Sequence, residues 1–302
     1  MESPVVVGVD GSDASLTASD WAVDEAVRHG LPLRVMHASL WERYEGVAPA
    51  WTTERPSGQV LAENIVATAA ERARLRAPRL KVSTDVLAED ATSMLLKAGH
   101  DAAVVVVGSH GRGAVADLLL GSVGLVVAAR APCPVIIVRG DRYALEARHE
   151  RVLLGVGEHD ADAPAIRFAF HEAAVRGAEL DVVHVWRRPG HEAVEHPLFT
   201  GDGGARTTEQ RASALLHDTL DAMVREHPDV PLRRTLIEGH PHRVLTERSA
   251  AADLLVVGAR RREALVGLQL GRVAHRALHR ASCPVAVVPQ QRPQTVVTKG
   301  DR

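Results

Sequence analysis

Short, mainly apolar runs recur along the first 140 residues, and each has the length of a β-strand. They are Val5–Val9, Leu33–Ala38, Lys81–Leu87, Ala103–Val107 and Val135–Val138. Apolar runs of this length without strict alternation are typical of strands buried on both faces. The pattern therefore predicts five interior strands in this part of the chain.

Between these runs, apolar residues return at helical spacing. The stretch Ser15–His29 places Trp21 and Ala26 on one face and is followed by Gly30, a favourable residue for ending a helix. Further helices are predicted over Val60–Arg76 and Val123–Arg130. Because parallel strands need long crossover connections, the alternation of strand and helix indicates a mainly parallel sheet with helices on both faces.

The same pattern occurs a second time along the chain. The segment "RAPCPVIIV" around Cys133 is matched 150 positions later by "RASCPVAVV" around Cys283, and "VVVGVDGSDAS" is matched 147 positions later by "VLLGVGEHDAD". A repeat of about 145 residues is too long for a solenoid unit and has the size of a domain. We therefore expect two tandem doubly wound α/β domains, at 1–140 (the first copy) and 151–290 (the second copy).

Composition narrows the class of protein. Lys and Arg number 36 against 38 Asp and Glu, which argues against a broad basic surface for nucleic acid or an anionic membrane. No apolar window reaches the length of a membrane span and no signal-like start is present, so we expect a soluble, cytoplasmic protein. The two cysteines are interpreted as small buried side chains of a reducing compartment rather than as redox or metal groups.

A glycine-spaced loop, "GSHGRGAVADLLLGS", follows the fourth predicted strand. Gly108 ends that strand, and Gly111 and Gly113 allow a sharp turn that presents backbone N–H groups to an anion. At the other end of the loop Gly121 precedes Ser122, which we predict as the N-cap of the next helix. A helix N-terminus favours phosphate, so both ends of the loop indicate a phosphate site.

An acidic residue, Asp10, ends the first strand. In open parallel sheets, ligands bind outside the carboxyl ends of the strands, where the strand order reverses. If the first and fourth strands are neighbours, Asp10 faces the glycine loop across that crevice. Its carboxylate could then bind ribose hydroxyls or a magnesium ion carried by the phosphates.

In these features the chain resembles a tandem universal stress protein. The nucleotide motif of that family, Gly-x-x-Gly followed by nine residues and Gly-Ser or Gly-Thr, is matched by Gly108, Gly111, Gly121 and Ser122. The resemblance covers nearly the whole chain. It implies a five-stranded sheet in the order 3-2-1-4-5 in each domain, ATP between the first and fourth strands, and dimerisation through the fifth strand.

The resemblance also implies which residues hold the nucleotide. In the family, the acid after the first strand lies by the ribose, the end of the second strand lies by adenine, and the loop glycines hold the phosphates. The residues at the matching positions are Val9, Asp10, Ala38, Gly108, Gly111, Gly121, Ser122 and Val123. We add Arg112 as a loop cation within reach of a phosphate. The expected ligand is ATP, alone or with Mg²⁺, and we assign neither a catalytic residue nor a metal site.

The second copy departs from this motif. It has Gly157 in place of Asp10, Arg261 in place of Gly111 and Arg272 in place of Ser122, although Gly258 and Gly271 are retained. Each change removes a group that the site needs, so we predict weak or absent ATP binding there. Residues 260–262 with Arg272 form either a basic pocket for another anion or a solvated charged face.

The fifth strands, "VIIV" and "VAVV", carry none of the charges that protect an exposed sheet edge. They are expected to pair with each other, which makes the chain an internal pseudo-dimer. Pairing between two chains, in a homodimer, would cover the edges equally well.

Three functional classes remain open. The first is an ATP-binding stress-response regulator with an unidentified protein partner, its second domain serving as structural pseudo-dimer partner. The second is an enzyme, a slow ATPase or phosphotransferase, for which the loop offers only His110 and Arg112. The third is an adaptor that uses no nucleotide. A metal role for His240 and His242 is disfavoured, because this spacing on a helix directs the two rings differently.

Overall fold

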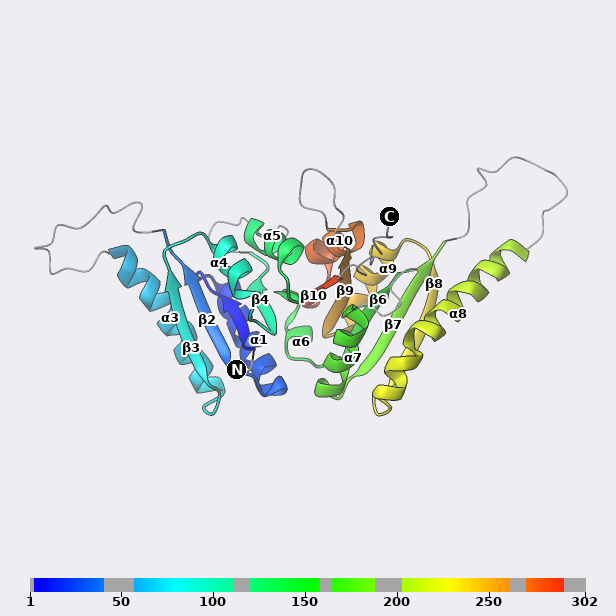
Figure 1. Cartoon of the computed structure of the whole chain (residues 1–302), viewed down its shortest axis with the longest axis horizontal. Coiled ribbons are helices and arrows are strands. Elements are labelled where there is room, and N and C mark those ends of the chain that lie inside the picture. Colours follow the sequence, from blue (N-terminus) through cyan, green and yellow to red (C-terminus); the bar gives the residue numbers. More distant parts are fainter. Residues whose placement is uncertain are drawn as a thin grey trace, which may run out of the picture.

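The computed structural model describes residues 3–40, 57–110, 120–157, 164–187, 203–260 and 270–290. Within them, ten strands form one continuous sheet in the order β3-β2-β1-β4-β5-β10-β9-β6-β7-β8. Figure 1 shows the two halves of the chain side by side, with β3 and β8 at the outer edges. Each half therefore has the predicted order 3-2-1-4-5.

The strands of the first half lie within one residue of the predicted runs. They are β1 (Val5–Gly8), β2 (Leu33–Ala38), β3 (Val82–Leu87), β4 (Val104–Gly108) and β5 (Val135–Val138). The strands of the second half are β6 (Arg151–Val156), β7 (Glu179–Trp186), β8 (Leu232–Glu238), β9 (Leu254–Arg260) and β10 (Val285–Gln290). All neighbours pair in parallel except β5 and β10.

Helices cover both faces of the sheet. One face carries α1 (Asp13–His29), α3 (Ser57–Arg76), α7 (Pro164–Arg176) and α8 (Gly203–Glu226). The other carries α4 (Ala91–Ala98), α5 (Ser122–Arg130), α6 (Arg142–Leu145), α9 (Pro241–Arg248) and α10 (Arg272–Arg280). A short 3-10 turn, Ser249–Ala251, follows α9. The two hydrophobic cores each run through both halves, so the halves fold as one body.

The helix after β1 begins two residues before the predicted Ser15 and ends at the predicted His29. Ser12 caps α1 by accepting a hydrogen bond from the N–H of Ser15, and Gly30 ends it with φ of 65°. That left-handed conformation is readily adopted by glycine. Trp21 and Ala26 are buried in the core, as predicted.

The predicted start of α5 is wrong by one residue. Its N-cap is Gly121, not Ser122, and no side chain caps the helix. The N–H of Gly121 donates to the carbonyl of Ser109 at 2.8 Å, and the carbonyl of Gly121 accepts from Leu125. These bonds hold Gly121 in an extended conformation, so Ser122 becomes the first helical residue.

The two halves join through their fifth strands, as predicted for an internal pseudo-dimer. β5 and β10 pair antiparallel, with Ile136 opposite Ala286 at the centre of the register. Both side chains are fully buried. Each fifth strand thereby covers the edge that the other would expose to solvent.

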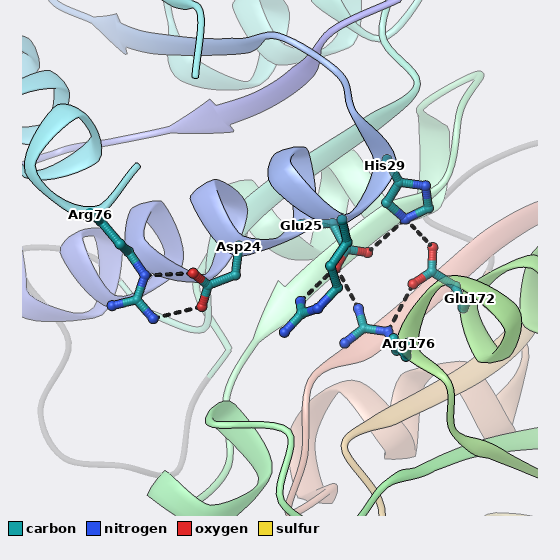
Figure 2. Close-up of polar contacts among 7 residues, drawn as sticks. Asp24, Glu25, His29, Arg76, Glu172 and Arg176 are labelled. Atoms are coloured by element: carbon teal, nitrogen blue, oxygen red, sulfur yellow. Dashed lines mark hydrogen bonds and ion pairs between the residues drawn. The ribbon is translucent and has the colours of Figure 1, made fainter. Parts of the chain in front are cut away.

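A buried ionic cluster also joins the halves, where α1 meets α7 (Figure 2). Arg176 donates to Glu25 at 2.5 Å and to Glu172 at 3.0 Å. The Nε2 atom of His29 lies 3.1 Å from Glu172 and 3.4 Å from Glu25. Glu25 and Glu172 occupy equivalent positions of the repeat, as do His29 and Arg176, so the pseudo-twofold axis brings all four together.

Arg28 also pairs with Glu25, at 3.2 Å, so three cations face two carboxylates when His29 is protonated. Burial opposes the charged form of His29, but its bonds to Glu172 and Glu25 outweigh burial and raise the pKa of His29 to about 9. Burial likewise opposes the charge of Glu25, yet Arg176 and His29 hold the pKa of that carboxyl well below its usual range. Glu25, His29 and Glu172 could also ligate a metal, but Arg28 and Arg176 already pair with these carboxylates.

Candidate functional site

A pocket of about 520 Å³ lies at the carboxyl ends of β1, β2 and β4. Its position is the place where the strand order of the first half reverses, since β1 has β2 on one side and β4 on the other. The residues that line it are Gly8, Val9, Asp10, Ser15, His37, Ala38, Ala91, Met94, Leu95, Val107, Gly108, His110, Gly121, Ser122, Val123 and Gly124.

Most of the residues proposed from the sequence meet in this pocket. The members of the proposed set that line it are Val9, Asp10, Ala38, Gly108, Gly121, Ser122 and Val123. They come from the ends of β1 and β2 and from both ends of the glycine loop. The remaining two, Gly111 and Arg112, lie outside the described residues.

Asp10 is held in a fixed turn at the mouth of the pocket. Its Oδ1 accepts hydrogen bonds from the hydroxyl of Ser12 at 2.6 Å and from the N–H of Ser12 at 3.0 Å. Gly11 between them has φ of 80°, which favours glycine. The N–H of Asp10 lies 3.3 Å from the hydroxyl of Ser15. The short segment from β1 to α1 thus positions a carboxylate beside the pocket without needing a ligand.

Gly108, the first glycine of the motif, is required by packing. A Cβ atom at this position would lie 2.8 Å from the backbone carbonyl oxygen of Ala14. The end of β4 therefore passes directly against the first turn of α1. This close approach brings Gly108 and the turn that contains Asp10 to the same pocket.

The first turn of α5 forms another part of the wall. Ser122, Val123 and Gly124 all line the pocket, and no side-chain cap competes for the N–H groups of this turn. Such a turn offers hydrogen-bond donors and the positive end of the helix dipole to an anion. This end of the pocket is therefore suited to phosphate.

His37 was not among the proposed site residues, although it lines the pocket. Its Nδ1 atom lies 2.7 Å from the carbonyl oxygen of Val9. In the second half, His184 makes the same contact with Val156 at 3.0 Å but is buried. The repeated contact ties the first two strands together in each half. The matching strand positions of the two histidines were visible in the sequence, but the exposure of His37 to a pocket was not.

A larger hollow, of about 760 Å³, lies at the opposite end of β2, between the ends of α1 and α3. It contains none of the residues proposed from the sequence. It has several cations, among them Arg28 and Lys81, but it lies away from the carboxyl ends of the strands. We therefore place the candidate site in the smaller pocket.

The corresponding region of the second half is built differently. Gly157 follows β6 where Asp10 follows β1, and Arg272 is the first residue of α10 where Ser122 begins α5. Trp186, buried at the end of β7, stands at the position of Ser39. Arg261 lies outside the described residues.

Comparison with known proteins decides the family. The model of the universal stress protein family matches this chain twice, over residues 1–139 and 149–289. The chain belongs to the universal stress protein family. Its two matched segments correspond to the two halves of the ten-stranded sheet.

Several relatives match along nearly the whole chain. A universal stress protein of Mycobacterium tuberculosis is 34% identical over 294 residues, covering 95% of this chain and 97% of its own. One from Mycolicibacterium smegmatis is 32% identical over 301 residues, with coverage of 95% and 97%. The crystal structure of a universal stress protein from Archaeoglobus fulgidus, 19% identical, has a TM-score of 0.67 over 95% of this chain and 98% of its own, which supports the fold.

Within the described residues, none of the helices combines the length and the apolar character needed to cross a bilayer. That finding agrees with the amphipathic placement of the helices against the sheet.

Proposed function

We propose that the first half of this universal stress protein binds ATP and that the protein acts as a nucleotide-dependent regulator. The observation that carries the proposal is that Asp10 and the uncapped first turn of α5 line the same pocket. The carboxylate of Asp10 suits a ribose or a phosphate-bound Mg²⁺, and the first turn of α5 suits the phosphates. The two lie at the reversal of strand order, where nucleotide sites of open α/β sheets occur.

The remaining walls fit a base. Ala38, Met94 and Leu95 give the pocket an apolar side next to the end of β2, and Met94 and Leu95 belong to the core beneath it. A volume of about 520 Å³ falls within the usual range for small-molecule sites. Adenine would lie against this apolar side, with its phosphates directed toward Ser122.

A regulatory role accounts for the groups present better than a dedicated ATPase does. Fast hydrolysis needs a positioned base for water and a cation on the transferred phosphate. The base candidate among the described residues of the loop is His110, whose Nδ1 lies 3.0 Å from the hydroxyl of Ser109. Slow, incidental hydrolysis is the most that we expect.

The test is a calorimetric titration of ATP with Mg²⁺ into the wild type and Ser122→Glu. A carboxylate at the first position of α5 is favourable for the helix but repels phosphate, so we expect ATP affinity to fall by at least about tenfold with the fold intact. Ser83→Glu, an exposed serine of β3, makes the same charge change away from the pocket and should bind like the wild type. If Ser122→Glu binds ATP with the same affinity as the wild type, this pocket is not the ATP site. If the wild type does not bind ATP, the result favours an adaptor that uses no nucleotide.

A further inference from the structure

Cationic side chains cover the part of the second half that corresponds to the mouth of the nucleotide pocket. Three elements meet there: the end of β7, the first turn of α9 and the first two turns of α10. The side chains are Arg187, His240, His242, Arg272 and Arg276, and we call them the basic patch. The first half has no cation at the equivalent positions, which are Leu40, Asp90, Thr92, Ser122 and Val126.

Contacts join Arg187, His240 and His242, and helix packing places the start of α10 beside them. The Nη2 atom of Arg187 lies 2.6 Å from Nδ1 of His240, and Nδ1 is the acceptor because a guanidinium only donates. The rings of His240 and His242 lie 5.7 Å apart. α9 packs against α10, where Arg272 and Arg276 are one turn apart on the same face; Figure 1 shows the two helices next to each other.

The members of the patch act on one another electrostatically. Partial burial and the positive charge of Arg276, Arg187 and Arg272 lower the pKa of His242. The positive charge of the patch is therefore carried by its arginines, and their field disfavours protonation of His242.

The described residues of α10 and β10 include no acidic side chain that could balance this charge. Residues 270–290 contain three arginines, two histidines and no Asp or Glu. Nearby, Glu247 is ion-paired with Arg243 at 2.8 Å. The other nearby acidic residue, Glu238, is the last residue of β8. Within the described part of the chain, Arg187, Arg272 and Arg276 form no ion pair with a carboxylate. Exposed arginines elsewhere do, such as Arg76 with Asp24 at 2.6 Å (Figure 2).

We propose that the basic patch binds a small polyphosphate anion, at a site separate from the nucleotide pocket of the first half. Guanidinium groups bind phosphate through paired hydrogen bonds. Gly271, the N-cap of α10, carries no side-chain cap, and the space around its missing Cβ is open for at least 4 Å. The helix N-terminus and the arginines can therefore approach the same anion.

The extent of the patch favours a small anion over nucleic acid or an acidic protein. Its members lie on the first turn of α9, the first two turns of α10 and the end of β7, at the carboxyl edge of the sheet, where small ligands bind in this class of fold. The second half as a whole is not basic: residues 151–290 hold 18 Arg and 18 acidic residues. An extended nucleic-acid surface would need a broader positive field.

The test is a calorimetric titration of inorganic tripolyphosphate into the intact chain. The double variant Arg272→Ser with Arg276→Val installs the residues of the first half, and we expect it to weaken binding at least about tenfold. Arg233→Ser with Arg234→Val makes the same substitutions on the exposed edge of β8 and should bind like the wild type. Thermal melting of each variant checks that the fold is retained.

Ser122→Glu separates this proposal from the nucleotide site. If Ser122→Glu abolishes tripolyphosphate binding while the double variant retains it, the anion sits in the first half and the patch proposal is overturned. If the wild type does not bind tripolyphosphate, the patch proposal is also overturned, and the result for ATP is unaffected. A single-stranded oligonucleotide that binds the patch more tightly than tripolyphosphate would replace the small anion by nucleic acid.

Discussion

At position 108, the packing and the proposed site both require a glycine. The missing Cβ lets β4 pass within contact distance of Ala14, and the same approach places Gly108 in the pocket that Asp10 lines. The glycine spacing in the sequence directed attention to this end of β4. It could not reveal the packing reason, because Ala14 and Gly108 are distant in sequence and meet only through the β1–β4 pairing.

Replacing Gly108 by alanine is expected to destabilise the protein by about 1–3 kcal/mol, because the new Cβ meets backbone atoms that cannot easily move. Urea denaturation measures the change. Gly8→Ala is the matched control: its Cβ would meet the flexible side chain of Leu95 at 3.1 Å, so a smaller loss is expected. Equal stability of Gly108→Ala and the wild type would contradict the packing account.

His29 gives a second prediction at this scale. Its pKa is raised from 6.5 to about 9 in the folded protein, so the stabilisation is fully present below pH 6.5 and disappears as pH rises through about 9. The protonated His29 contributes up to about 3 kcal/mol to the free energy of unfolding. Above about pH 9, Cys133 continues the loss of stability, since burial raises its pKa from 9.0 to about 11 and its thiol ionises first in the unfolded chain.

An NMR titration of the His29 ring reads this pKa directly, and a midpoint near 6.5 would refute the ionic account of the cluster. The change in unfolding free energy from pH 6.5 to 9, compared between the wild type and His29→Gln, gives the stability effect. The wild type should lose more stability over that range than the variant, because glutamine does not titrate.

Among the elements, strands were predicted better than helix ends. Strands such as β4 and β5 are continuous apolar runs, which mark interior strands regardless of their partners. The start of α5 depended on the bond between Gly121 and Ser109, which no local pattern shows. The four-residue cluster around Glu25 was missed, since it depends on packing between helices 147 residues apart. A glutamate at the same position of both copies was the available signal.

The antiparallel pairing of β5 and β10 within one chain can be tested by crosslinking. Cysteines at Ile136 and Ala286, with Cys133 and Cys283 replaced by alanine, face each other directly in the register. Oxidation should give an intramolecular disulfide, seen as a single-chain species on a non-reducing gel. A covalent dimer in place of that species would mean that the fifth strands pair between chains.

For the molecule as a whole, one sheet carries two halves of the same topology with different chemistry at equivalent edges. The two halves share the contact of a strand histidine, His37 or His184, with the carbonyl at the end of the neighbouring strand. They differ at the pocket mouth, where the second half has Arg272 at the position of Ser122. The internal repeat and the lost motif residues were visible in the sequence. Convergence of the basic patch from β7, α9 and α10 required the structure.

The most direct test of the account is the number of ATP molecules bound per chain, measured with Mg²⁺ by native mass spectrometry alongside calorimetry. We expect one ATP on the intact chain and on the double variant Arg272→Ser with Arg276→Val, and none on Ser122→Glu at the same concentration. Two equivalent molecules per chain, or one that persists in Ser122→Glu, would contradict the assignment of the nucleotide to the first half.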